Sequence, residues 1–115
     1  MTPPIAENKR QERIEGWAGL RWLSGGPPVI LIKDRPTPLA SDIYTQILRA
    51  CEPNQEKSIA RILEFHRRST AYLYALCQEG AERRNLDNSL SAENVAPHEI
   101  AAAAACLMYK LNVKE

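Results

Sequence analysis

The residues of this sequence best suited to chemistry are basic side chains gathered in one segment. Residues 57–84 hold six basic and three acidic residues, so this segment carries a net charge of +3. The rest of the chain holds nine basic and eleven acidic residues, and the chain as a whole carries only +1. Such a concentration of charge can bind phosphate groups, although a solvated helix face with incidental ion pairs is the alternative. The basic residues are Lys57, Arg61, Arg67, Arg68, Arg83 and Arg84.

A serine at position 69 is a second feature with chemical potential. Ser69 follows Arg67 and Arg68 and precedes an apolar stretch, which is the pattern of a helix N-cap. The first turn of a helix leaves backbone N–H groups without partners inside the helix, and these groups can bind phosphate. Tyr72 and Tyr74 follow and could stack on bases or close a pocket, although core packing is the commoner role of a helical tyrosine.

Other chemistries have less support. A hydrolase that uses His66 is one hypothesis, but no orienting acid or oxyanion element can be assigned, and the hypothesis requires that His66 line a pocket. The cysteines lie far apart among apolar neighbours without C-x-x-C spacing, so we expect buried, reduced thiols and neither a metal site nor a cofactor. We therefore expect a protein that is not an enzyme. The cysteines are Cys51, Cys77 and Cys106.

Two helices separated by a break are expected to position the basic segment. Apolar side chains at helical spacing predict a helix over residues 55–66, with basic side chains on its other face. Ser69 and Thr70 then interrupt the apolar pattern, and a further helix is expected over 69–78. The alternative is one unbroken helix over 55–78, but a Ser-Thr pair is better suited to a cap than to a helix interior.

The remaining sequence predicts one mostly helical domain over residues 9–115, preceded by a flexible tail at 1–8. The inner stripe of its last helix is expected at Ile100, Ala104, Leu107, Met108 and Leu111. The other expected elements are helices over 9–23 and 41–51 and from Pro97, a buried strand over 29–32, and short extended pieces at Leu39 and over 84–88. The fold class is therefore α+β and mostly α-helical, with about five helices and two or three short strands.

Length and composition fit this single domain. The chain has 115 residues, of which 44% are hydrophobic and 25% are charged. No apolar run approaches the roughly 18 residues of a membrane helix. Residues 1–13 are polar and of mixed charge, which differs from a signal peptide. We expect a soluble, cytoplasmic protein.

Three short motifs together resemble the ProQ/FinO family of bacterial RNA-binding proteins. In order, they are Pro38-Leu39, then His66-x-x-Ser69-x-x-Tyr72-Leu73-x-Ala75-Leu76, then Gly80-Ala81-Glu82-Arg83-x-x-Leu86-Asp87. The likeness runs from about Pro28 to Leu107, and the order, spacing and expected elements of the motifs agree.

The resemblance implies a small α/β RNA chaperone of one ProQ/FinO-like domain. Family members bind structured RNA, notably the stem-loop and single-stranded 3′ tail of terminators. They stabilise small or antisense RNAs and promote RNA–RNA pairing in post-transcriptional regulation. For this chain the resemblance implies small RNAs, antisense RNAs and mRNA 3′ ends as partners of a monomer. The implied contacts to the RNA 3′ end are Ser69, Thr70, Tyr72 and Arg83, with Arg67 beside them, while Lys57, Arg61 and Arg68 would follow the stem backbone.

The sequence also departs from the family pattern. Ala40, Ala60 and Glu64 stand at positions that are often basic in relatives, and Arg61 and Arg67 are the neighbouring cations that could compensate. The low net charge and the alanine-rich last helix support an alternative, a helical protein–protein interaction module without a nucleic-acid role.

Overall fold

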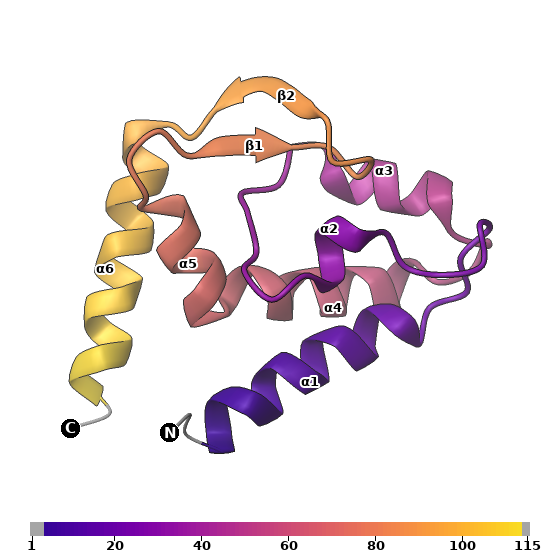
Figure 1. The fold of residues 1–115 in the computed structure, drawn as a ribbon, viewed down its shortest axis with the longest axis horizontal. Helices are drawn as coiled ribbons and strands as arrows, with labels where there is room; N and C mark the ends of the chain where they lie inside the picture. The colour runs from indigo at the N-terminus through magenta and orange to yellow at the C-terminus, as the bar shows by residue number, and fades with distance from the viewer. Residues whose placement is uncertain (1–3, 114–115) are drawn as a thin grey trace.

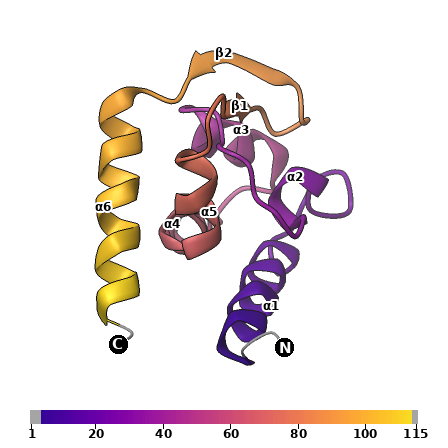
Figure 2. The same ribbon diagram turned by 60° about the vertical axis from the view of Figure 1, so that its left-hand side comes forward.

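The computed structural model describes residues 4–113, which form six helices and one two-stranded sheet (Figure 1). Each of the first five helices contributes side chains to the main core, and the last helix packs mainly against the fifth. Figure 2 shows α4 and α5 between α6 and α1. The elements are α1 (Pro4–Ala18), α2 (Val29–Ile32), α3 (Ile43–Ala50), α4 (Glu56–Arg68), α5 (Thr70–Leu76), β1 (Glu82–Arg84), β2 (Leu90–Asn94) and α6 (Pro97–Val113).

The first helix begins earlier and ends earlier than expected. It starts at Pro4, so residues 4–8, which we assigned to the tail, are helical; proline suits the first turn because its ring presets the helical φ. Residues 1–3 of the expected tail lie outside the described residues. The helix ends before Gly19, and the Trp22 indole N–H donates to the Trp17 carbonyl at 2.8 Å, which satisfies a terminal carbonyl.

The strand expected over residues 29–32 is wrong, because these residues form the short helix α2. Pro28 precedes it with extended backbone at ψ 144°, and the helix buries Ile30 and Leu31. A buried strand needs a neighbouring strand for its backbone groups, whereas a helical turn satisfies several of them locally. The Arg13 guanidinium completes this pattern by donating to the carbonyls of Leu31 at 3.0 Å and Lys33 at 2.8 Å.

The expected break between two helices at Ser69 is confirmed. Ser69 has extended backbone at φ −64° and ψ 145° between α4 and α5. Its hydroxyl accepts from the Tyr72 backbone N–H at 3.2 Å and donates to the His66 carbonyl at 2.7 Å. One side chain therefore serves both helix ends and fixes the angle at which the chain turns.

The two-stranded sheet brings distant parts of the chain together. β1 and β2 are antiparallel, with Glu82 opposite Asn94. Leu39 pairs with Arg84 in a parallel bridge, which confirms the expected extended piece at Leu39. The Arg84 backbone N–H donates to the Pro38 carbonyl at 2.9 Å. This pairing holds the neighbouring Arg83 beside the Leu39 backbone.

The last helix starts at Pro97 as expected, but its inner stripe is shorter than expected. Ile100, Ala104 and Leu107 are partly buried, whereas Met108 and Leu111 are 64% and 58% exposed. The seven residues of α5 are too few to cover the seventeen of α6, so α5 leaves Met108 and Leu111 near the end of α6 exposed. No helix within residues 4–113 is long and apolar enough to cross a membrane.

The expectation of three buried thiols holds for one cysteine. Cys51 is buried, Cys77 is partly buried and Cys106 is exposed on α6. All three cysteines are free thiols.

Candidate nucleic-acid interface

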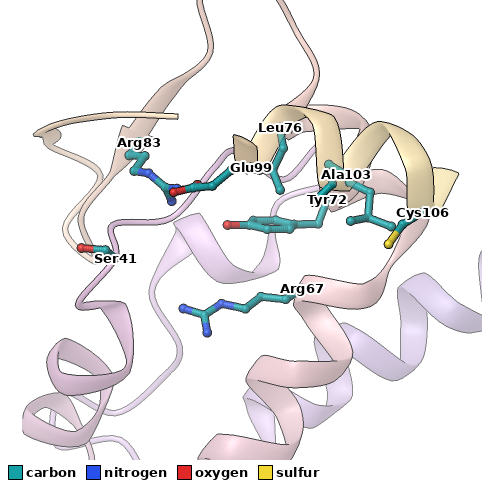
Figure 3. A pocket seen from close by; sticks show the side chains of 10 residues that line it. Ser41, Arg67, Tyr72, Leu76, Arg83, Glu99, Ala103 and Cys106 are labelled. Atoms are coloured by element: carbon teal, nitrogen blue, oxygen red, sulfur yellow. The ribbon is translucent and has the colours of Figure 1, made fainter. Parts of the chain in front are cut away.

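A first pocket of about 420 Å³ lies where α4, α5, β1 and α6 meet (Figure 3). We call it the Tyr72 pocket. Arg67 comes from α4, Tyr72 from α5, Arg83 from β1 and Glu99 from α6. Its walls combine small apolar side chains with these polar groups. The lining residues are Ser41, Arg67, Tyr72, Leu73, Leu76, Arg83, Glu99, Ala102, Ala103 and Cys106.

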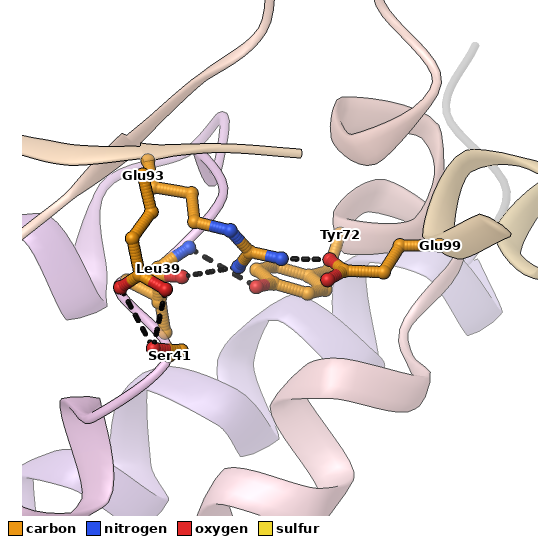
Figure 4. A network of polar contacts seen from close by, with 6 residues as sticks. Leu39, Ser41, Tyr72, Glu93 and Glu99 are labelled. Atoms are coloured by element: carbon orange, nitrogen blue, oxygen red, sulfur yellow. Dashed lines mark hydrogen bonds and ion pairs between the residues drawn. The ribbon is translucent and has the colours of Figure 1, made fainter. Parts of the chain in front are cut away.

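Four polar groups of the Tyr72 pocket, those of Ser41, Tyr72, Arg83 and Glu99, already have hydrogen-bond or ion-pair partners (Figure 4). The Tyr72 hydroxyl accepts from the Leu39 backbone N–H at 3.0 Å, and the Arg83 guanidinium donates to the Leu39 carbonyl at 2.6 Å. Arg83 also forms an ion pair with Glu99. The Ser41 hydroxyl donates to the Glu93 carboxylate at 2.7 Å. The pocket is therefore held in shape by contacts from five separate segments, which are residues 39–41, α5, β1, β2 and α6.

Tyr72 contributes to the core as well as to the pocket. Its side chain belongs to the buried cluster and is 4% exposed. Its ring lies 5.1 Å from that of His66, at an interplanar angle of 58°. Because so little of the ring is accessible, its broad face cannot serve as a stacking surface for a base in this conformation. Core packing, the commoner reading of a helical tyrosine, applies here.

A second pocket of about 370 Å³ opens at the junction of α4 and α5. We call it the Ser69 pocket. Three cations face one carboxylate here, and the cations are exposed or partly buried. Arg68 pairs with Glu64 at 2.9 Å, and the Lys110 ammonium of α6 donates to the Arg68 carbonyl. The lining residues are Arg61, Glu64, Phe65, Arg68, Ser69, Thr70 and Lys110.

A third pocket, of about 440 Å³, joins the other two across the last turns of α4. Arg67 borders both this pocket and the Tyr72 pocket, and Arg68 borders both this pocket and the Ser69 pocket. The adjacent Arg67 and Arg68 therefore lie between the two sites, with Glu64 beside Arg68. Tyr44, Ala60, Leu63 and Glu64 complete the lining.

The eight residues predicted as RNA contacts thus fall into three groups. Arg67, Tyr72 and Arg83 meet in the Tyr72 pocket. Lys57 is exposed on α4 and lines none of these three pockets. The other four, which meet in the Ser69 pocket, are Arg61, Arg68, Ser69 and Thr70.

His66 lies beneath both pockets in the core and lines none of the three. It is 0% exposed, and its ring contacts Trp17 at 5.9 Å between centroids. Burial, and secondarily the charges of Arg13 and Arg67, lower the pKa of His66 to about 3. A histidine without access to a pocket cannot reach a substrate, so the hydrolase hypothesis loses its candidate residue.

The sequence did not single out three residues that the structure brings to these pockets. Glu99 reaches Arg83 from the first turn of α6, while Phe65 and Lys110 enter the Ser69 pocket. Phe65 is 39% exposed although its apolar character favours the core. Only the packing of α6 against α5 brings Glu99 and Lys110 close to residues far from them in sequence. Within residues 4–113, no cluster of three potential metal ligands occurs.

The fold has a counterpart among solved structures. The crystal structure of a FinO-like RNA chaperone from Neisseria meningitidis MC58 matches with a TM-score of 0.61 and 26% sequence identity. The match covers 96% of this chain and 83% of that chain. No protein-family model and no curated protein matches the sequence. The expected α+β, mostly helical fold is therefore confirmed as a FinO-like fold.

Proposed function

We propose that this protein is an RNA chaperone that binds a structured RNA through the Tyr72 and Ser69 pockets. The observation that carries the proposal is the likeness, over 96% of the chain, to a FinO-like RNA chaperone. The exposed arginines of α4, Arg61, Arg67 and Arg68, support it, because phosphate binding needs cations that solvent can reach. The protein would act in the cytoplasm as a monomer and stabilise small or antisense RNAs and promote their pairing with targets.

The Ser69 pocket and Lys57 would contact different parts of a terminator hairpin with a single-stranded 3′ tail. Arg61 and Arg68 in the Ser69 pocket would bind tail phosphates, together with Lys110. Phe65, partly exposed beside these cations, would stack on a base of the tail. Lys57 would contact the backbone of the stem, whose A-form major groove is too narrow for side chains.

A gel-shift comparison tests this proposal. One hairpin carries a 3′ oligouridine tail, and a matched hairpin ends bluntly. We expect tighter binding of the tailed RNA and a steep loss of affinity with added salt, because counterions are released from the phosphates. Equal affinity for the two RNAs would reject recognition of the 3′ tail, and no binding of either would reject the proposed function.

The exposed end of α6 favours a second candidate function, a protein–protein interaction module. Met108, Tyr109 and Leu111 are each more than half exposed on this segment. The two functions differ in what accompanies the purified protein. Co-purified nucleic acid, seen as a high ratio of absorbance at 260 to 280 nm that ribonuclease removes, supports the chaperone, and its absence supports the interaction module.

A further inference from the structure

We propose that Glu99 is an affinity-determining residue that occupies the anion-binding side of Arg83 and competes there with phosphate. This inference rests on the proposed RNA-binding function for its biological meaning, but its chemistry can be tested without RNA. If the proposal is right, Glu99 lowers the affinity of the Tyr72 pocket for phosphate below the affinity that Arg67 and Arg83 would give without it.

The geometry of Arg83 carries the argument. Its side chain is 9% exposed, and its two terminal nitrogens are both engaged, one with the Leu39 carbonyl and one with Glu99. Glu99 is the more accessible partner, because its side chain is 35% exposed. The Leu39 carbonyl is part of the backbone and cannot leave, whereas the Glu99 side chain can rotate. An anion that enters from solvent can therefore take the place of Glu99 on Arg83 only by displacing its carboxylate.

The energetic balance follows from charge. An arginine with little exposure needs a partner, since an unpaired buried charge is costly. A phosphate that displaces Glu99 gains a charge-assisted hydrogen bond but loses an existing one, and it meets the displaced carboxylate as a like charge. The Ser69 pocket has no such obstacle at Arg61, which is exposed on α4. The two pockets should thus differ in their affinity for the same anion.

A purely structural role is the competing explanation for Glu99. It lies in the first turn of α6, where a carboxylate is favourable near the positive end of the helix dipole. Loss of that role would lower the thermal stability without raising the affinity for phosphate. Affinity and stability must therefore be measured on the same variants.

The first experiment is a titration with inorganic phosphate, followed by NMR at the Arg83 Nε–Hε resonance in the wild type and in Glu99→Gln. This resonance reports on the Tyr72 pocket even if phosphate also binds elsewhere. We expect about fivefold tighter phosphate binding at Arg83 in the variant, the scale of one screened charge-assisted hydrogen bond. Equal or weaker binding in a folded Glu99→Gln protein would overturn the proposal.

Three further variants make the result specific. Glu93→Gln removes a carboxylate that bonds Ser41 in the same pocket without bonding Arg83, so less than about a twofold change is expected. In Arg83→Met/Glu99→Gln, which lacks the Arg83 resonance, the backbone amide of Leu39 serves as the reporter, and it is recorded for Glu99→Gln as well. The gain at this amide should disappear in the double variant; a gain that persists would contradict competition for Arg83. If Glu99→Gln does not fold, Glu99→Asp keeps the charge at the helix start but shortens its reach. A folded Glu99→Asp with unchanged phosphate affinity would likewise overturn the proposal.

The tailed hairpin provides the link to RNA. If Glu99 competes with RNA phosphate, Glu99→Gln should bind the hairpin several-fold more tightly than the wild type. A hairpin that binds neither protein would reject the proposed function, and the phosphate titration would still decide the role of Glu99. If Glu99→Gln binds phosphate more tightly but binds the hairpin with unchanged affinity, RNA does not contact Arg83. That result would overturn the proposal that Glu99 competes with RNA phosphate.

Discussion

Arg83 of the Tyr72 pocket differs in burial and bonding from Arg61 and Arg68 of the Ser69 pocket. In the Tyr72 pocket, Arg83 is almost fully buried and bonded to Leu39 and Glu99. In the Ser69 pocket, Arg61 and Arg68 are exposed, and the one ion pair there is itself solvent-exposed. An internally bonded arginine shapes a site, whereas a solvated arginine attracts phosphate. Residue type alone does not distinguish these two roles; burial and partners do.

The largest expected effect is on stability, from Arg83→Ala. The substitution leaves the Leu39 carbonyl without its side-chain donor and Glu99 without its partner, so we expect a loss of about 3 kcal/mol in the free energy of unfolding. Urea denaturation measures it. Arg84→Ala is the matched control on the same strand, because the Arg84 side chain bonds to the Asn88 carbonyl in an exposed turn. Equal losses in the two variants would show that Arg83 does not organise the pocket.

A smaller loss of stability is expected at acidic pH, because His66 beneath the Tyr72 pocket becomes protonated on unfolding. The pKa of His66 is about 3 in the folded protein and close to the ordinary 6.5 when unfolded. Between these two pKa values, His66 binds a proton in the unfolded state but not in the folded state. The free energy of unfolding is therefore highest above pH 6.5 and falls as the pH drops toward 3. Between pH 6.5 and 5 we expect a loss of about 2 kcal/mol from this group.

Urea denaturation at the two pH values measures this loss, and His66→Phe provides the comparison. Phenylalanine keeps an aromatic ring against Trp17 and Tyr72 but cannot be protonated. The variant should lose less stability over this range than the wild type. The same pH dependence in both proteins would mean that His66 is not the group responsible.

The smallest effect is expected from the double substitution Arg61→Ala/Arg68→Ala in the Ser69 pocket. Both side chains are exposed, so stability should change by less than about 0.5 kcal/mol. The affinity for the tailed hairpin should fall about tenfold, and the salt dependence of binding should decrease by about two phosphate contacts. Arg49→Ala, an exposed arginine on α3 outside the three pockets, is the control. Equal losses in both proteins would indicate general charge attraction instead of a site.

Local signals were sufficient for much of the fold. The break at Ser69 could be predicted because a hydroxyl at a helix end has a specific backbone partner. The helix over residues 29–32 could not be predicted in this way. Its apolar residues indicate only that the segment is buried, and a short buried helix and a short buried strand have the same apolar pattern. Only the lack of a neighbouring strand decides between them.

The candidate site was less predictable than the fold. The basic residues of α4 could be named from the sequence because their spacing follows one helix face. Glu99 could not, since its relation to Arg83 depends on how α6 docks against α5 and β1. For the same reason the sequence joined Ser69 and Tyr72 in one site, although they line different pockets.

The double use of the Leu39 peptide groups has a consequence for hydrogen exchange. Its N–H donates to the Tyr72 hydroxyl of α5, and its carbonyl accepts from Arg83 of β1. The Leu39 amide can exchange with deuterated solvent only when the 36–41 segment separates from α5. Its exchange rate therefore measures how often the Tyr72 pocket comes apart in the intact protein, at a single backbone position.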